Sequence, residues 1–483
     1  MGQRRGQHAQ LPDPAREGEG LPRRPRGAGG AGRRAPARAG PAHPRRGRGL
    51  EAAARVAAAR PRGTGHDRRC HRAPRPAGAR APVRRPLTVD RPGGAGTEGL
   101  RRDNTAAVLR SLRRCGPSTR AELAKDTGLA KATVGVIVAD LQAAGAVAEE
   151  GSRPGVRGRP GRPVALRGEG VVALGLELNV DYTSAVVLDL AGQVVLSESR
   201  PGTGDTADLL ALARDAYAAA VGDGRRLVGA TVAVPALVRG DNRTVAWAPN
   251  LHLEGAGLAD DLTATLAELG AGPTPAVRVS NDANCAAYAE SHHGAARGAA
   301  HALYLTGTVG IGAGIVQGGE LVRGAAGFAG EVGHMPLGDA SAVCGCGRHG
   351  CWEASVGLHA MLAEVGMHEL DTPLRTAEAV AERAATDAGV RAGLERVGRG
   401  VGLGIAMLSS VLDPEVVVLG GYFAPLGDLV LDPARRTLDE RLASEAQVRP
   451  ELRLSTLGIR AAALGAAEQS LGPVFSGELD LTS

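Results

Sequence analysis

The chain has 483 residues, 43% of them apolar, and a formal net charge of +6. This length allows two or three domains with hydrophobic cores, and the longest apolar runs are too short to span a bilayer. The six cysteines do not form a disulfide framework, and no apolar segment typical of a signal peptide follows the basic first residues. We therefore expect a protein of the reducing cytoplasm that does not bind membranes.

The charge is divided unevenly along the chain. Residues 1–100 carry about +16 and residues 101–163 about +6, whereas the remainder carries about −16. A basic first part joined to an acidic second part is typical of a protein in which one part binds nucleic acid and the other does not.

Residues 1–98 consist mainly of Arg, Ala, Pro and Gly and show no apolar periodicity. Such a segment buries too little apolar surface to offset the conformational entropy of the chain, so we predict a disordered basic tail. Two interpretations remain open. The tail adds non-specific affinity for DNA, or it is a GC-rich upstream stretch included by a misassigned start codon.

Residues 101–150 are predicted to form a winged helix-turn-helix domain. Apolar residues recur at helical spacing from near Asn104, which indicates a first helix. Thr119, with a glutamate three residues later, has the signature of a capping box that opens a second helix. Gly128 permits a tight turn before a third helix over Lys131–Ala144. This order is typical of DNA-binding domains, and the alternative is a small structural three-helix bundle.

Residues 151–167 are predicted to form a wing followed by a basic linker. In RGRPGRP, Pro keeps the chain extended and Gly lets it lie close to DNA, so the arginines can enter an electronegative minor groove. The alternative is a solvated linker. The third helix carries few polar side chains on its exposed face, so base contacts there are few. The candidate DNA-binding residues are Arg120, Lys131, Thr133, Arg157, Arg159 and Arg162.

Residues 168–483 alternate between strands and helices. A three-strand pattern over residues 171–198 is followed by a helix and a strand. The same three-strand pattern recurs over residues 301–322, and a helix and a strand recur over residues 401–421. Two copies of a strand-rich α/β unit predict two lobes with a ligand-binding cleft between them.

Two motifs in the second half resemble a known family. They are GIGAGIVQGGELVRGAAGFAGEVGHMPLG from Gly310 and CGCGRHGCWE from Cys344. Together they closely resemble the ROK family of bacterial sugar kinases and sugar-responsive repressors, and the resemblance covers about residues 104–470. It implies an actin-like, hexokinase-like fold of two α/β lobes. In the repressor branch it also implies a winged helix-turn-helix in front.

The two motifs together supply the ligands of a metal site. Cys344, Cys346 and Cys351 offer three thiolates, and His334 offers a fourth ligand. A closed set of three cysteines and one histidine leaves no position for an activated water, so we expect structural Zn²⁺, as the resemblance also implies. The alternative is reduced cysteines without a metal.

The resemblance places five residues around the hydroxyl groups of a sugar: Asn281, Asp282, Glu331, His334 and Glu353. Carboxylates and amides suit this task because they form paired hydrogen bonds. His334 would then serve both the metal and the sugar. The aspartate matching Asp282 is the general base of the family's kinases, so Asp282 is a catalytic candidate only if this chain is a kinase.

Both phosphate loops of the kinases are altered here. Residues 177–181 replace a D-x-G-G-T-type turn whose backbone amides approach phosphates, and Asp181 adds negative charge there. Thr308 and Val309 replace a Gly-Thr pair. We therefore predict that the chain is not an enzyme. Tight strand turns suffice to explain the glycines that remain in this segment, Gly310, Gly312 and Gly314.

We interpret the chain as a transcriptional repressor whose effector sugar, or sugar derivative, binds in the cleft and lowers the affinity for a double-stranded DNA operator. A homodimer or a dimer of dimers suits an operator with two half-sites. One rival is an ATP-dependent, glucokinase-like sugar kinase with a regulatory N-terminal domain. The other is a DNA-binding scaffold that no longer senses sugar, and the complete set of sugar-binding residues argues against it.

Overall fold

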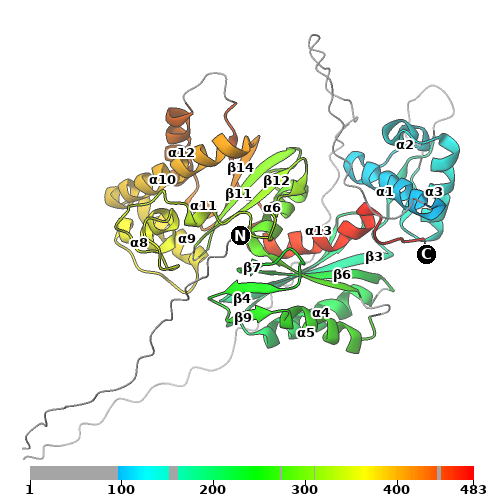
Figure 1. The fold of residues 1–483 in the computed structure, drawn as a ribbon, viewed down its shortest axis with the longest axis horizontal. Coiled ribbons are helices and arrows are strands. Elements are labelled where there is room, and N and C mark those ends of the chain that lie inside the picture. The colour runs from blue at the N-terminus through cyan, green and yellow to red at the C-terminus, as the bar shows by residue number, and fades with distance from the viewer. Residues whose placement is uncertain are drawn as a thin grey trace, which may run out of the picture. The chain divides into compact units, whose positions relative to one another are not determined.

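The computed structural model describes residues 96–151, 161–222, 224–271, 275–308, 310–442 and 448–482 (Figure 1). Nearly all of the predicted basic tail lies outside these residues, and so do Arg157, Arg159 and Val309. The described residues belong to one compact unit. No helix among them is long and apolar enough to cross a membrane.

The first elements form a small helical domain with a two-stranded ribbon. Three helices pack around shared apolar side chains: α1 (Thr97–Cys115), α2 (Arg120–Thr127) and α3 (Lys131–Ala143). The ribbon consists of β1 (Val147–Glu149) paired antiparallel with β2 (Val164–Leu166). The second strand falls within the segment predicted as wing and linker, so the end of that segment is part of the ribbon.

Capping hydrogen bonds and a glycine with positive φ explain the ends of the second helix of this domain. The backbone N–H of Glu122 donates to the Thr119 hydroxyl at 3.3 Å, and the Glu122 carboxylate accepts from the Thr119 N–H at 2.8 Å, so the capping box is confirmed. Gly128 ends α2 with a φ of 74°, which glycine adopts at little cost. The first helix begins at Thr97, earlier than the predicted start near Asn104. The sequence did not reveal this start because the first turns of the helix are exposed and carry no apolar period.

The first lobe is a five-stranded sheet of order β10-β6-β3-β4-β5. Its three antiparallel strands are β3 (Val171–Leu178), β4 (Tyr182–Asp189) and β5 (Val194–Pro201). Two further strands run parallel to β3, namely β6 (Arg226–Val234) and β10 (Ala276–Asn281). One face is covered by α4 (Thr206–Val221) and α5 (Gly257–Glu268), and the other by α13 (Ala461–Ser476) (Figure 1). A small sheet beside it contains β7 (Leu237–Val238), β8 (Val245–Ala248) and β9 (Leu253–Gly255).

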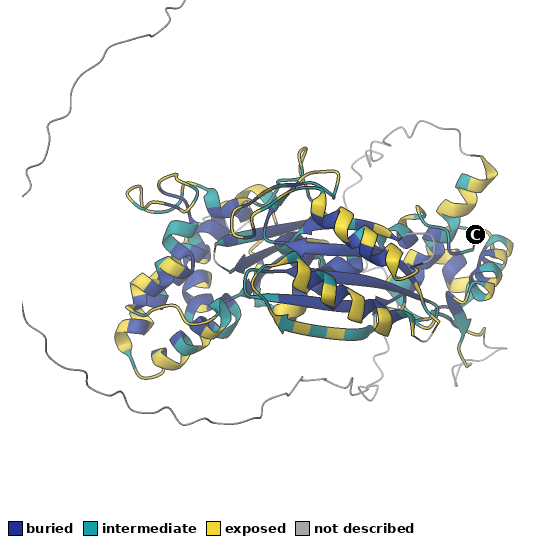
Figure 2. Ribbon diagram, turned by 90° about the horizontal axis from the view of Figure 1, so that it is seen from below, coloured by how far each residue is buried: buried dark blue, intermediate teal, exposed yellow. Residues whose placement is uncertain are grey.

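The second lobe repeats this plan in the order β13-β12-β11-β14-β15. Its strands are β11 (His301–Gly307), β12 (Ile311–Gln317), β13 (Glu320–Leu321), β14 (Val416–Gly421) and β15 (Glu451–Leu454). Its helices are α7 (Glu353–Val356), α8 (Leu358–Val365), α9 (Pro373–Ala384), α10 (Ala388–Leu412), α11 (Phe423–Leu426) and α12 (Asp428–Arg441). The inner strands of both sheets are mostly buried and the edge strand β5 is not, while many outer helices alternate buried and exposed faces (Figure 2). The two-lobed α/β architecture predicted from the repeated pattern is confirmed.

Two helices, α6 (Asp282–His293) and α13, pack against each other between the sheets. A Cβ added at Gly465 of α13 would lie 1.7 Å from the Cys285 carbonyl oxygen of α6. A Cβ added at Gly314 of β12 would lie 2.5 Å from the Ala283 carbonyl oxygen, also in α6. Close helix packing therefore explains this glycine of β12. Tight turns were the wrong explanation for Gly312 and Gly314, which lie inside β12, whereas Gly310 does lie in the short turn between β11 and β12.

Candidate functional site

Four potential metal ligands lie together in the second lobe. His334 ends a short 3₁₀ turn, η1 (Val332–His334), and three cysteines precede α7. One ligand atom from each of the four lies within 4.8 Å of the others. Cys346 Sγ lies 3.7 Å from Cys351 Sγ, and Cys344 Sγ lies 3.8 Å from His334 Nδ1. A tetrahedral ion with metal–sulfur bonds of about 2.3 Å would hold sulfur atoms about 3.8 Å apart, so this cluster can hold a metal ion.

A buried tryptophan fixes the loop that carries these cysteines. The side chain of Trp352 is 2% exposed, and its Nε1–H donates to the Gly400 carbonyl of α10 at 2.9 Å. Gly404, one turn later, leaves room for the indole, because a Cβ there would lie 2.0 Å from the ring. The Trp352 backbone N–H donates to the Met335 carbonyl at 2.7 Å. The loop is therefore attached both to the 3₁₀ turn and to the longest helix described.

The two predicted glutamates flank the histidine on different sides. Glu353 Oε1 accepts from the Cys344 thiol at 2.8 Å and lies 3.6 Å from His334 Nδ1. Its second oxygen accepts from the Ile311 backbone N–H at 3.3 Å. Glu331 Oε2 lies 4.0 Å from His334 Nε2. One ring nitrogen of His334 thus faces the cysteines, and the other faces Glu331.

Asn281 and Asp282 lie where β10 passes into α6. The Asn281 side chain accepts from the Asn284 N–H at 3.0 Å, which caps α6, and donates to the Ala236 carbonyl at 3.2 Å. Burial, together with the charge of Glu331, raises the pKa of Asp282 to about 6. The structure therefore brings Glu331 and Glu353 to within 4.0 Å and 3.6 Å of His334, and the charge of Glu331 also acts on Asp282.

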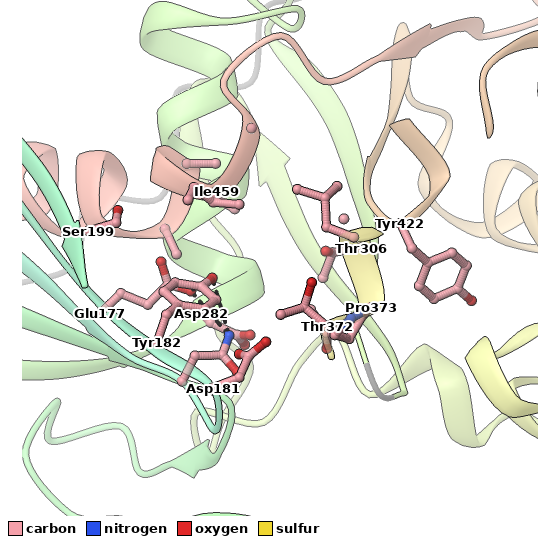
Figure 3. A pocket seen from close by; sticks show the side chains of 18 of the residues that line it. Glu177, Asp181, Tyr182, Ser199, Asp282, Thr306, Thr372, Pro373, Tyr422 and Ile459 are labelled. Carbon is pink, nitrogen blue, oxygen red and sulfur yellow. Dashed lines mark hydrogen bonds between the residues drawn. The ribbon is translucent and has the colours of Figure 1, made fainter. Parts of the chain in front are cut away.

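A cavity of about 430 Å³ opens beside Asp282. Among the described residues that line this cavity, Asp282 is the one that was predicted to bind sugar. Figure 3 shows Glu177, Asp181 and Tyr182 on the same side as Asp282, with Thr306 and Thr372 opposite. Sequence reasoning did not find Tyr182 or Thr372. They lie on the β3–β4 hairpin and at the start of α9, where no motif marks them.

The charges around this cavity are mainly negative. The phenol of Tyr182 donates to Glu177 Oε1 at 2.6 Å, and burial raises the pKa of Glu177 to about 8. Burial also raises the pKa of Asp181. Arg200 is the one cation among the described lining residues, and its guanidinium lies 2.8 Å from a Glu198 oxygen and 2.7 Å from an Asp215 oxygen. The cavity therefore offers no uncompensated positive charge to a polyphosphate.

Three backbone amides in the described part of the altered loops already donate within the protein. Within the hairpin, the Val180 N–H donates to the Asn179 side chain at 2.8 Å, and the Asn179 N–H donates to the Tyr182 carbonyl at 2.9 Å. In the second loop, the Thr308 N–H donates to the Gly310 carbonyl at 3.1 Å. Phosphate loops bind anions through free N–H groups, so these three amides are not available for that purpose.

Four of the candidate DNA-binding residues are described. Lys131 at the start of α3 is exposed, and Thr133 is partly buried. Arg120 pairs with the Glu149 carboxylate, and Arg162 Nη1 lies 3.5 Å from the other oxygen of Glu149. Two predicted DNA contacts therefore converge on one carboxylate of the ribbon, which the sequence pattern did not indicate.

Comparisons with known proteins agree with this geometry. A family model described as ROK family matches residues 173–470. The xylose repressor of Bacillus subtilis (strain 168) is 28% identical over 373 residues, which cover 76% of this chain and 94% of that protein. A glucokinase of Streptomyces coelicolor is 28% identical over 323 residues, which cover 62% of this chain and 98% of the enzyme. The crystal structure of a ROK family transcriptional regulator, a homologue of the E. coli MLC protein, covers 78% of this chain and 97% of its own, with a TM-score of 0.65 at 22% identity.

Proposed function

This chain belongs to the ROK family, and we propose that it is a sugar-responsive, DNA-binding transcriptional repressor. The observation that carries the proposal is the contrast between two parts of the cleft. Glu331, His334 and Glu353 form a contacting set of groups that suits sugar hydroxyls. In the neighbouring segments that match the kinases' phosphate loops, three backbone amides already donate within the protein, and Asp181 adds a carboxyl.

The effector is a sugar or sugar derivative held by Asn281, Asp282, Glu331, His334 and Glu353. The metal in the neighbouring cluster is Zn²⁺, which suits three thiolates and an imidazole. It would be held by His334, Cys344, Cys346 and Cys351. Its contribution is to fix the loop, so that Glu353 and His334 keep their positions when the sugar binds.

DNA is bound by the helical domain and ribbon. We assign residues 101–150 to a winged helix-turn-helix, residues 151–167 to its wing and linker, and residues 168–483 to the sugar-binding part. Exposure of Lys131 at the start of α3 supports a role in the major groove, and Arg162, near Glu149 of the ribbon, is assigned to the minor groove. A dimer matches an operator of two half-sites, and sugar binding lowers operator affinity by about 5- to 150-fold.

Screening sugars by thermal unfolding tests the effector. The panel is D-xylose, other aldopentoses, aldohexoses and N-acetylhexosamines. An effector present at 100 times its dissociation constant stabilises the protein by about 2.7 kcal/mol. Operator DNA is selected from a random library with the purified protein, and its affinity is measured with and without each stabilising sugar. A protein that binds no selected duplex, or whose DNA affinity no sugar changes, is not the repressor proposed here.

The glucokinase match and the retained Asp282 make a sugar kinase the alternative. Incubating each stabilising sugar with ATP and Mg²⁺ separates the two functions. We expect no phosphorylated sugar. A turnover above about 1 per second, ordinary for a working enzyme, would establish the kinase instead.

A further inference from the structure

A series of polar contacts connects the cleft with the DNA-binding domain. It starts at α6, whose first residue is Asp282 and whose cap is Asn281. The last residues of α6 are His292 and His293. A helix of 12 residues at about 1.5 Å each is about 18 Å long. One helix therefore begins at the predicted sugar site and ends well away from it.

The far end of α6 meets a buried carboxylate of α13. Glu468 is 2% exposed, and His293 Nε2 donates to its Oε2 at 2.9 Å. His292 Nε2 lies 4.0 Å from the other oxygen, Oε1. That same oxygen forms an ion pair with Arg113, which lies in the last turn of α1 in the helical domain. Glu468 is thus held by side chains of two other helices.

The cluster contains one positive and one negative charge, those of Arg113 and Glu468. Burial and the neighbouring positive charge of Arg113 lower the pKa of both histidines to about 4, so both imidazoles are neutral at pH 7. Burial lowers the pKa of Arg113 to about 10, which leaves it charged. The Glu468 carboxylate is therefore compensated by Arg113 of the DNA-binding domain, and a buried charge that loses its partner is strongly destabilised.

Further contacts hold α1 to the end of α13. The Arg113 guanidinium lies 4.2 Å from the centre of the Phe475 ring. One turn earlier, Arg110 Nη1 donates to the Phe475 carbonyl at 2.7 Å. Because α6 packs closely against both α13 and β12 of the second lobe, a change in the angle between the lobes would act on the contacts of α6 with α13. The contact between His293 of α6 and Glu468 of α13 lies beside Arg113 of α1, because Arg113 pairs with the same carboxylate.

We propose that Arg113, Glu468 and His293 are the positioning residues through which sugar in the cleft sets the orientation of the DNA-binding domain. The proposal rests on the proposed function and names the residues by which its two sites are coupled. In the sugar-free protein these contacts hold α1 in the orientation that binds the operator. Closure of the lobes around sugar shifts α6, weakens the hold on Glu468, and releases Arg113.

The test uses the full-length protein and two variants. Glu468→Gln keeps the size of the side chain and an acceptor for His293 but removes the charge that Arg113 needs. Arg113→Met keeps the contact with Phe475 and removes the charge from the other side. Arg114→Gln is the matched control, because Arg114 is adjacent but pairs with Asp126 inside its own domain. Operator affinity, with and without the sugar selected by the thermal screen, and sugar affinity are measured for each.

We expect Glu468→Gln and Arg113→Met to bind the sugar like the parent, while their operator affinity changes less than twofold when sugar is added. Arg114→Gln should respond to sugar like the parent. A full response in both Glu468→Gln and Arg113→Met would overturn the proposal.

Amide hydrogen exchange along α1 of the sugar-free protein gives a second result that requires no sugar. Glu468→Gln should speed exchange in the second half of α1 by at least about tenfold, because that half loses its hold on α13. If Glu468→Gln leaves exchange in α1 unchanged, the contact between Arg113 and Glu468 does not hold α1, and the proposal fails even if no sugar acts on the parent. If exchange speeds up as expected but no sugar changes the operator affinity of the parent, the proposed function alone is overturned.

Discussion

The phenol of Tyr182 donates a hydrogen bond of 2.6 Å to the buried carboxyl of Glu177. Glu177 begins residues 177–181, the segment that by resemblance replaces the first phosphate turn of the family's kinases. A buried carboxyl that shares its surroundings with Asp181 and Asp282 is costly to ionise. The pair therefore predicts a measurable dependence of stability on pH.

Glu177→Gln should stabilise the protein more at pH 8 than at pH 5. The folded-state pKa of Glu177 is raised from 4.5 to about 8, so between these values the folded state binds a proton that the unfolded state lacks. The free energy of unfolding then falls as pH rises, by up to about 1.4 kcal/mol per pH unit. Glutamine keeps the acceptor for Tyr182 and has no proton to lose. Urea unfolding at both pH values should give a difference of at least about 1 kcal/mol, and equal effects at pH 5 and pH 8 would show that Glu177 titrates normally.

Cys346→Ser should separate DNA binding from the sugar response. Removing one thiolate releases or weakens the metal, so the loop that carries Glu353 loses its fixed geometry. The side chain that anchors the metal loop, Trp352, belongs to a different apolar cluster from the helical domain, so the helical domain should stay folded. The variant should therefore bind operator DNA but no longer release it when sugar is added. Zinc content is measured alongside, and Cys115→Ser, which alters a cysteine outside the cluster, is the control.

Two other outcomes of that experiment have distinct meanings. If operator binding vanishes together with the sugar response, the metal is needed for the DNA-binding fold or for the dimer. If Cys346→Ser responds normally and the parent holds far less than one zinc per chain, the cysteines hold no metal.

Lys131→Met should weaken operator binding by about 1–3 kcal/mol and relax the base preference at one position of each half-site. Lys131 is exposed at the start of α3, where a recognition helix meets base edges. Lys125→Met, at an exposed position in the last turn of α2, is the control and should lower affinity similarly for all duplexes. Titrations of the selected operator and its single-base variants distinguish these results. An unchanged base preference in Lys131→Met would remove this residue from direct readout.

Gly465→Ala should destabilise the protein by about 1–3 kcal/mol or more. The added methyl would lie 1.7 Å from the Cys285 carbonyl, and backbone atoms cannot rotate away as a side chain can. Gly472→Ala in the same helix meets no atom within 4 Å, so it should be neutral or stabilising by up to about 1 kcal/mol. Urea unfolding of both variants measures the difference. Equal stability of the two would mean that α6 and α13 are less closely packed than described.

The sequence predicted the structure well where a single residue determines where an element begins or ends, or where ligands lie close together in the chain. Thr119 begins α2, Gly128 ends it, and the spacing of His334 and the cysteines brought four ligands together as expected. Prediction failed where the partner is distant in the sequence. The glycines of β12 were predicted to be turn residues, since the neighbouring sequence does not show that α6 packs against them. The pairing of Arg120 and Arg162 with Glu149 was not predicted either, since the spacing of the two arginines does not show that both face that carboxylate. Their contacts with DNA stay a prediction.

The anchoring of Trp352 has an optical consequence. The chain contains two tryptophans, and Trp247 is 47% exposed whereas Trp352 is 2% exposed. An indole enclosed by apolar groups emits at shorter wavelength than one in water, so Trp352 should supply the blue component of the intrinsic fluorescence. Because its backbone directly follows Cys351, loosening of the cysteine loop should shift that component to the red. The protein therefore carries its own spectroscopic reporter of the metal loop, without any attached label.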